Sequence, residues 1–160
     1  MAPHDTGAAK PQILVFSTNI ISDPGIDLAG SSHLDYPATV QVIAVPCSSG
    51  INPRWVLRAL QAGFDGVFIA ADGGDCAYVS DCTDRTGKIV EQAQQLIVEH
   101  GLDPRRLRMA AICSVCSEPF VSHIKKFHKA LVELTWAEFS QVASTSAQGA
   151  AVPSGTALPA

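Results

Sequence analysis

Short apolar runs alternate with longer periodic segments along most of this sequence. The runs are rich in Val, Ile, Leu and Ala, and they have the length of strands that are buried on both faces of a sheet. The pattern predicts strands at residues 13–16, 40–45, 66–70 and 107–112.

Each predicted strand is followed by a segment whose apolar residues recur at the three- and four-residue spacing of a helix. Ser22, Asn52 and Ser117 stand where helix caps are expected, each shortly before a proline, and Gly63 and Gly101 supply stops. Four successive strand–helix units predict an α/β fold. We expect a small four-stranded parallel sheet with helices on both faces, in a flavodoxin/Rossmann-like three-layer arrangement.

The length and composition favour one domain that works as part of a larger assembly. The 160 residues, of which 47% are hydrophobic, are enough for a single core. We expect one domain at residues 11–140, between disordered tails at residues 1–10 and 141–160, where small residues show no periodicity. Only 16% of the residues are charged, which indicates a surface that other chains partly cover.

Charge and the N-terminal sequence argue against several classes of protein. The net charge is −4, and the one group of basic residues, Arg105, Arg106 and Arg108, is too small for a nucleic-acid surface. No secretory signal opens the chain, and no apolar run is long enough to cross a membrane. We therefore expect a cytoplasmic protein whose five cysteines serve metal or redox chemistry.

All five cysteines follow predicted strands. Cys47 follows the second strand, Cys76 and Cys82 lie in the loop after the third, and Cys113 and Cys116 follow the fourth. Because the carboxyl ends of parallel strands face one common crevice, we expect the five thiols at a single edge of the sheet.

A soft metal site needs three or four thiolates that approach one another closely. The Cys113-x-x-Cys116 spacing lets two thiolates bind one metal, and Cys47 and Cys76 complete a set of four. This set predicts an iron-sulfur cluster or a zinc ion. Cys82 is given less weight, because Asp81 and Asp84 flank it and would raise its pKa.

Other interpretations of the same residues stay open. The cysteines are also consistent with buried apolar thiols, and Cys113 and Cys116 with a redox dithiol near the start of a helix. The acidic glycine-rich loop at residues 71–76 is interpreted as a solvated turn rather than a magnesium site, and the dinucleotide-binding fingerprint is absent. No catalytic residue is predicted. The histidines show no ligand spacing: His4, His33, His100, His123 and His128.

Several short motifs occur in an order that is familiar from one protein family. They are Ile13-Leu14-Val15-Phe16, Asp27-Leu28-Ala29-Gly30, Tyr36-Pro37, Val45-Pro46-Cys47-Ser48, Asp65-Gly66-Val67 and Gly74-Asp75-Cys76-x-Tyr78. On these motifs the chain resembles the delta (iron-sulfur) subunit of methyl-viologen-reducing hydrogenase. The likeness covers nearly all of residues 12–134.

The resemblance implies a [2Fe-2S] protein without catalytic residues of its own. Such a protein passes electrons between a hydrogenase or dehydrogenase and a heterodisulfide-reductase-like FAD protein in a redox complex. The family has a Cys-x-x-Cys after the first strand, where this chain has Thr18 and Ile21, and a cysteine in the third loop at the position of Ala71. Only Cys47 and Cys76 fall on family cysteine positions.

Two outcomes follow from these replacements. In the first, Cys113 and Cys116 replace the missing ligands, and Cys47, Cys76, Cys113 and Cys116 hold a rearranged iron-sulfur cluster, which we predict. In the second, no cofactor is bound, and the domain is a docking and assembly module of the same complex. A dithiol redox or sulfur carrier that works through Cys113 and Cys116 is the further alternative.

Overall fold

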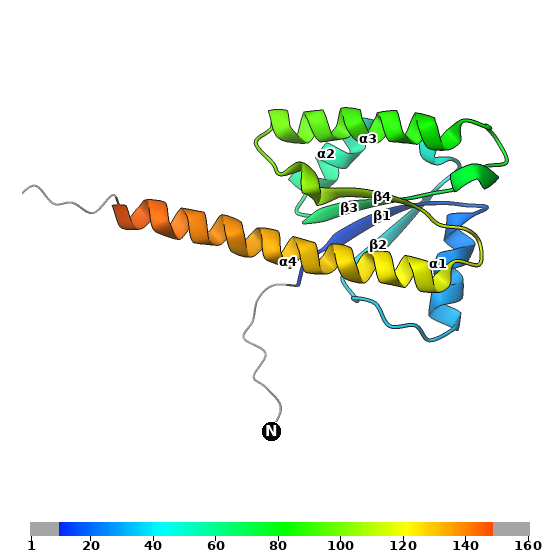
Figure 1. The fold of residues 1–160 in the computed structure, drawn as a ribbon, viewed down its shortest axis with the longest axis horizontal. Helices are drawn as coiled ribbons and strands as arrows, with labels where there is room; N and C mark the ends of the chain where they lie inside the picture. The colour runs from blue at the N-terminus through cyan, green and yellow to red at the C-terminus, as the bar shows by residue number, and fades with distance from the viewer. Residues whose placement is uncertain (1–9, 149–160) are drawn as a thin grey trace, which may run out of the picture.

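The computed structural model describes residues 10–148, in which strands and helices alternate (Figure 1). The strands are β1 (Ile13–Thr18), β2 (Val40–Val45), β3 (Gly66–Ala71) and β4 (Leu107–Ala111). The helices are α1 (Ser22–Ser31), α2 (Pro53–Gln61), α3 (Cys82–Glu99) and α4 (Ser117–Gln148). Short 3-10 turns are η1 (Ser48–Gly50), η2 (Gly73–Asp75) and η3 (Pro104–Arg106). Each predicted strand and helix is present.

The four strands form one parallel sheet in the order β2-β1-β3-β4, which confirms the predicted fold class. In the pairing, Ile13 of β1 lies opposite Val40 of β2 on one side and Gly66 of β3 on the other. From β1 the chain continues to β2 on one side of β1, and from β2 it crosses to β3 and β4 on the other side. The topological switch point therefore lies between β1 and β3. In open α/β sheets, ligands bind beyond the carboxyl ends of the strands at this switch point.

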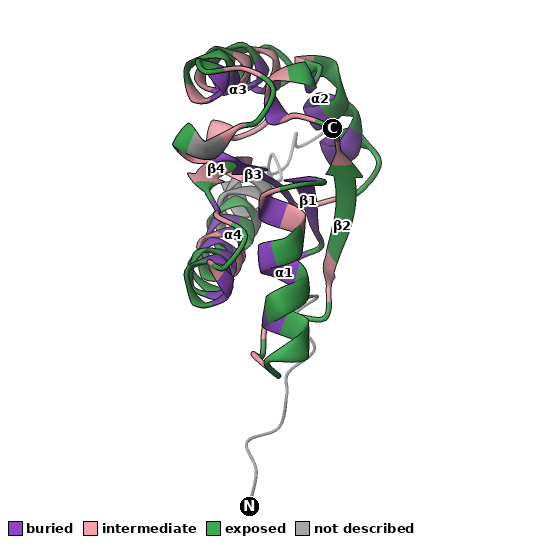
Figure 2. Cartoon of the chain, turned by 90° about the vertical axis from the view of Figure 1, so that its right-hand side faces the viewer, coloured by how far each residue is buried: buried purple, intermediate pink, exposed green. Residues whose placement is uncertain are grey.

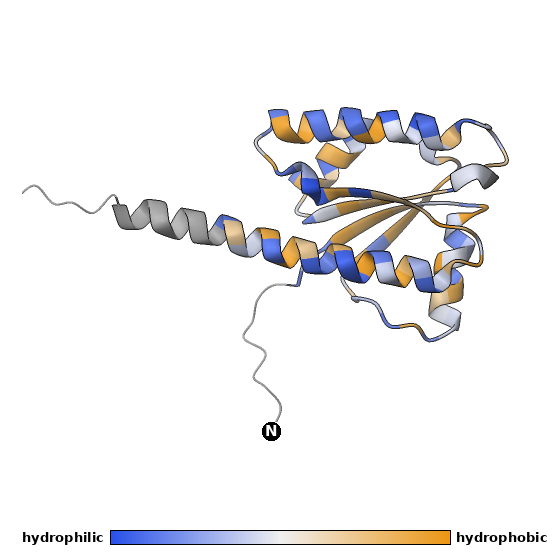
Figure 3. Cartoon of the chain, in the orientation of Figure 1, coloured by the Kyte–Doolittle hydropathy of each residue, from blue (hydrophilic) through white to orange (hydrophobic). Residues whose placement is uncertain are grey.

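The helices cover the sheet in two pairs, so the fold has three layers. Helices α1 and α4 contact each other on one face, and α2 and α3 contact each other on the opposite face (Figures 1 and 2). Both central strands are buried along their whole length, and the apolar residues concentrate in the sheet between the helices (Figure 3).

Alternate residues of the central strands supply two separate cores. Ile13, Val15 and Phe68 pack under α1 and α4, whereas Leu14 and Phe16 pack under α2 and α3. Strand β2 lies at one edge of the sheet and is mostly exposed, as its colour in Figure 2 shows.

The predicted cap of α2 and the predicted stops after α2 and α3 are confirmed, whereas Ser22 and Ser117 are the first residues of α1 and α4 rather than their caps. The side chain of Asn52 accepts a hydrogen bond of 2.9 Å from the backbone N–H of Arg54 at the start of α2. Gly63 and Gly101, after α2 and α3, adopt positive φ angles of 107° and 74°. Helix α4 continues to Gln148 and so includes residues 141–148, which were predicted as part of a tail. The rest of the predicted tails, residues 1–9 and 149–160, lies outside the described residues.

Candidate metal centre

Two loops at the carboxyl edge of the sheet bring three cysteines together. Cys47 stands between β2 and η1, Cys76 follows η2, and Cys82 is the first residue of α3. Because α3 packs against η1, the start of this helix lies beside the loop that carries Cys47.

The three sulfur atoms are close enough to bind a single centre. The Sγ atom of Cys47 lies 3.4 Å from that of Cys82 and 4.0 Å from that of Cys76. All three Sγ atoms lie within 4.8 Å of one another. Thiolates bound tetrahedrally to one metal, with metal–sulfur bonds of about 2.3 Å, are separated by about 3.8 Å. The spacing of these thiols therefore fits a soft metal centre.

Hydroxyl groups contact two of the three thiols, those of Cys47 and Cys82. The Ser49 hydroxyl lies 3.0 Å from the Sγ of Cys47, and the Ser48 hydroxyl lies 3.5 Å from the Sγ of Cys82. Ser48 is held in turn by Thr86, whose hydroxyl lies 2.9 Å away and also donates to the carbonyl oxygen of Cys82. These contacts orient the sulfur atoms, as outer contacts do around ligands in metal sites.

The surroundings move the pKa values of two of the thiols in opposite directions. Burial raises the pKa of Cys76 to about 11, and hydrogen bonds with Cys82 and Cys47 add to this effect. Burial also acts to raise the pKa of Cys82. Hydrogen bonds to Ser48, Cys47, Cys76 and a backbone N–H outweigh it, and the pKa of Cys82 is lowered. Cys82 is therefore the thiol of this pair that ionises more readily.

The pKa of Cys82 is lowered, although the neighbouring carboxylates of Asp81 and Asp84 predict a raised pKa and hence a weaker ligand. In the structure, the Asp81 carboxylate is paired with Arg85 at 2.9 Å, and hydrogen bonds reach the Cys82 sulfur. The position of Cys82 at the start of a helix on the cysteine-bearing edge was the signal that could have identified it.

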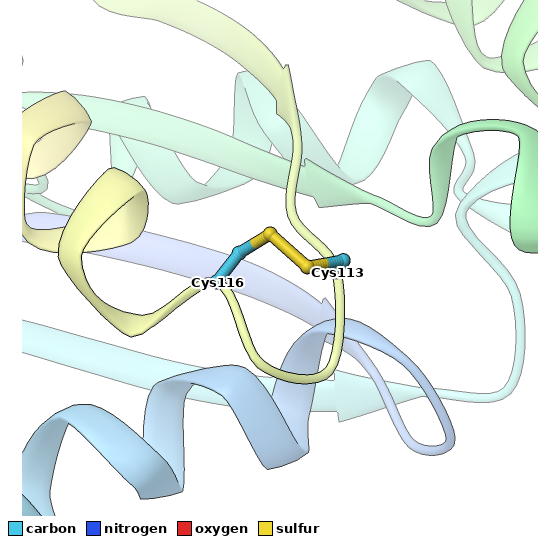
Figure 4. The surroundings of a disulfide bond; sticks show 2 residues. All are labelled: Cys113 and Cys116. Carbon is cyan, nitrogen blue, oxygen red and sulfur yellow. A yellow bond between two sulfur atoms is a disulfide. The ribbon is translucent and has the colours of Figure 1, made fainter.

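Cys113 and Cys116 form a disulfide with each other (Figure 4). They lie in the loop between β4 and α4, and Cys116 packs against the core under α1 and α4. Cys82 opens α3, which covers the opposite face of the sheet. Of the four predicted ligands, the structure therefore brings Cys47 and Cys76 together, adds Cys82 to them, and pairs Cys113 with Cys116. The predicted set of four stays a prediction.

The switch point between β1 and β3 is filled by a buried polar network. The Thr18 hydroxyl donates to the Asp72 carboxylate, and the Ser22 hydroxyl lies 3.0 Å from the same hydroxyl. Ser22 also donates to the carbonyl oxygen of Ala70 at 2.8 Å. Thr18, Ser22 and Asp72 are all buried. Thr18, which stands where the resemblance implies a cysteine, thus bonds within the chain.

No other group of this kind occurs within residues 10–148. There, Cys47, Cys76 and Cys82 form the one group of at least three Cys, His, Asp or Glu side chains close enough to share a metal ion. The histidines of that range contribute to no such group, and His4 lies outside it. Among the described helices, none is both long and apolar enough to span a membrane.

Comparison with known proteins gives one family and a consistent set of relatives. The sequence model of the family described as methyl-viologen-reducing hydrogenase, delta subunit, matches residues 13–135. Over 125 residues, the chain is 38% identical to one subunit of the ferredoxin:CoB-CoM heterodisulfide reductase of Methanosarcina mazei. That match covers 78% of the chain but only 16% of the relative.

Two further relatives are of similar size to this chain. One is the vhu iron-sulfur subunit of the F420-non-reducing hydrogenase of Methanopyrus kandleri, which is 32% identical over 68% of the chain and 82% of the relative. The protein of the same name from Methanocaldococcus jannaschii is also 32% identical, over 72% of the chain and 87% of the relative.

Proposed function

This chain belongs to the family of methyl-viologen-reducing hydrogenase delta subunits, and we propose that it is an electron-transfer subunit that carries an iron-sulfur centre. Its relatives are subunits of hydrogenases and heterodisulfide reductases, so it is related to subunits of redox complexes. The observation that carries the proposal is the group of three thiols, whose Sγ atoms lie within 4.8 Å of one another.

Thiolates are the usual ligands of an iron-sulfur cluster, and the separation of 3.4 Å between the Sγ atoms of Cys47 and Cys82 suits two ligands of one iron. A [2Fe-2S] cluster takes four protein ligands, usually thiolates, and when bound it supplies one-electron transfer. Cys47, Cys76 and Cys82 would hold it through three of these positions. Ser48 and Ser49 would keep their contacts to the sulfur atoms, and hydrogen bonds of this kind tune the reduction potential of a cluster.

The remaining ligand distinguishes two versions of the site. The set predicted from the sequence shares Cys47 and Cys76 with the group in the structure, and takes Cys113 and Cys116 in place of Cys82. We favour the set that contains Cys82, because its Sγ lies 3.4 Å from that of Cys47. In that version the fourth position is open to a donor from elsewhere in the chain or from a partner.

The relatives suggest what this protein contacts. In Methanosarcina mazei the matched segment is a small part of a much longer heterodisulfide reductase polypeptide, whereas in Methanopyrus kandleri it makes up most of a separate hydrogenase iron-sulfur protein. We propose that this chain docks on a heterodisulfide-reductase-like FAD protein and exchanges electrons with a hydrogenase or dehydrogenase partner.

Anaerobic reconstitution with iron and sulfide tests the proposed function. We expect about two iron and two sulfide ions per chain, with the visible absorption of a [2Fe-2S] cluster. Cys82→Ser should lower the iron content several-fold, and the matched control Cys113→Ser/Cys116→Ser should keep it. If Cys113→Ser/Cys116→Ser lost iron and Cys82→Ser kept it, the ligand set predicted from the sequence, Cys47, Cys76, Cys113 and Cys116, would be supported instead. A colourless, iron-free protein would exclude the cluster, and zinc binding without colour would identify a structural metal site.

A docking module without a cluster is the second candidate. It is favoured by the Thr18 hydroxyl, which bonds to Ser22 and Asp72 at a position where the resemblance implies a ligand. Co-purification with the flavoprotein but without metal would support this candidate. A chain that binds no such partner would contradict it.

A further inference from the structure

The disulfide between Cys113 and Cys116 is separate from the three thiols of the candidate centre. It closes the short loop between β4 and α4 (Figure 4), and both of its cysteines are partly exposed. The two residues between them, Ser114 and Val115, are exposed, and Val115 is 75% accessible. A reactant from solution can therefore approach this loop.

Backbone contacts hold the two cysteines near each other independently of the sulfur–sulfur bond. Ile112 is fully buried, and its N–H donates to the carbonyl oxygen of Ala71 at 2.8 Å, which fixes the chain just before Cys113. The N–H of Cys116 donates to the carbonyl oxygen of Cys113 at 3.0 Å. The two Cα atoms are 4.9 Å apart. Reduction therefore leaves two thiols that are already placed to form the bond again.

The two sulfur atoms are not equivalent. The carbonyl oxygen of Cys116 accepts a hydrogen bond of 3.1 Å from the N–H of Phe120, which makes Cys116 the N-cap of α4. A thiolate at the N-terminus of a helix is stabilised by the helix dipole and by free N–H groups. Cys116 is therefore the better leaving group of the pair, and Cys113 is the sulfur that an incoming thiolate attacks.

From this geometry we propose that Cys113 and Cys116 form a two-electron thiol–disulfide redox site whose reductant is a dithiol. One thiolate of the dithiol attacks the Sγ of Cys113, the bond between Cys113 and Cys116 breaks, and Cys116 leaves as a thiolate. The second thiol of the donor then attacks the donor sulfur that is bonded to Cys113. This forms the disulfide of the donor and releases Cys113. The donor ends as a disulfide, and the pair gains two electrons and two protons.

This site is independent of the proposed cluster. It uses none of Cys47, Cys76 and Cys82, so a variant in which all three are replaced by serine keeps the pair as its one source of thiols. A failure of the redox site in this variant says nothing about iron binding, and a chain that binds no iron can still carry the redox site.

Equilibration of this triple-serine variant in dithiothreitol and glutathione redox buffers provides the test. Thiol alkylation and mass measurement should show a single reversible step in which two thiols are gained or lost per chain. Far-ultraviolet circular dichroism should not change through that step. If the pair is reduced only when urea unfolds the chain, the disulfide is structural and the proposal is wrong. If the pair stays reduced in oxidised glutathione, the proposal is also wrong.

Trapping experiments test the direction of attack. In the oxidised triple-serine variant, a thioredoxin probe whose second active-site cysteine is replaced by serine should attack the disulfide and stay bound through a mixed disulfide at Cys113, which leaves the Cys116 thiol free for alkylation. At pH 7, the variant that keeps Cys116 alone should react with iodoacetamide about two- to tenfold faster than the variant that keeps Cys113 alone. Equal or reversed rates would contradict the assigned roles. Reduction by dithiothreitol but not by thioredoxin would limit the donor to small dithiols.

Discussion

Gly25, in α1, lies directly against the loop that carries the disulfide. A Cβ atom built on Gly25 would lie 2.5 Å from the carbonyl oxygen of Cys113 and 3.5 Å from the Cγ2 of Ile112. The atom at 2.5 Å belongs to the backbone, so it cannot turn away as the end of a side chain can. The absence of a side chain at Gly25 therefore allows the loop after β4 to cross over α1.

Gly25→Ala should destabilise the fold by about 1–2 kcal/mol, because the clash with a backbone atom outweighs the gain in helix propensity. Urea denaturation measures this change. The control is Gly30→Ala in the same helix, where an added Cβ meets nothing within 4 Å. That variant should be up to about 0.5–1 kcal/mol more stable than the parent. A stable Gly25→Ala variant would mean that the loop does not pack against α1 as described.

The cysteines show which parts of the site the sequence could and could not predict. Their placement after strands gave the correct edge of the sheet, because parallel strands direct these loops to one side. Their grouping depends on loop paths. Cys47 follows β2 and Cys76 follows β3, two strands separated by β1 in the sheet, yet their Sγ atoms lie 4.0 Å apart. Cys113 follows β4, which adjoins β3, and its loop instead passes over α1.

At the scale of elements, α4 has the core-facing residues that a helical pattern predicts, but its C-terminal end lies beyond the end expected from composition. Its buried residues recur at helical spacing: Phe120, Val121, Ile124, Phe127, Leu131 and Leu134. The helical spacing predicted for the segment after the fourth strand accounts for this face, because packing against the sheet requires it. The helix ends at Gln148 rather than near residue 140. Residues 141–148 lack apolar periodicity, but they contain no glycine or proline that would stop a helix.

His128 makes the packing of α4 sensitive to pH. Burial, together with the charge of Lys10, lowers the pKa of His128 below its ordinary value of 6.5, and its buried Nε2 atom has no hydrogen-bond partner. As the pH falls through the ordinary value, the unfolded chain binds a proton before the folded chain does. Stability should therefore fall from about pH 7 downward, until the folded pKa is also passed.

His128→Leu should reduce this loss of stability between pH 7.5 and 5.5. At pH 7.5 it should also stabilise the fold by about 1 kcal/mol, because it removes an unsatisfied buried nitrogen. Urea denaturation at the two pH values measures both effects. The control is His123→Gln, an exposed position on the same helix, which should keep the slope of the parent chain. If His128→Leu also keeps that slope, groups other than His128 cause the pH dependence.

At the scale of the whole molecule, the central strands couple the two cores. Leu14 and Phe16 point into the core under α2 and α3, and Ile13 and Val15 point into the core under α1 and α4. Loss of β1 from the sheet would therefore expose both cores to solvent. The alternation of strands and helices was enough to predict these layers, because a strand buried on both faces requires helices on each side. The strand order β2-β1-β3-β4 was not predictable, because it depends on contacts between distant segments.

This coupling predicts that the chain unfolds in a single step, and its two tryptophans can report on the two sides of the sheet. Trp55 lies on α2, with its ring centroid 6.5 Å from that of Phe16, and Trp136 lies on α4. Trp136→Phe leaves fluorescence from the α2 side, and Trp55→Phe leaves fluorescence from the α4 side. In each variant, the urea midpoint from fluorescence should coincide with the midpoint from circular dichroism. If fluorescence in Trp55→Phe changes at a lower urea concentration than circular dichroism does, α4 separates from the sheet before the rest of the domain unfolds. The two cores would then unfold as independent units. The strands β1 and β3, which contribute to both cores, would not make their unfolding cooperative.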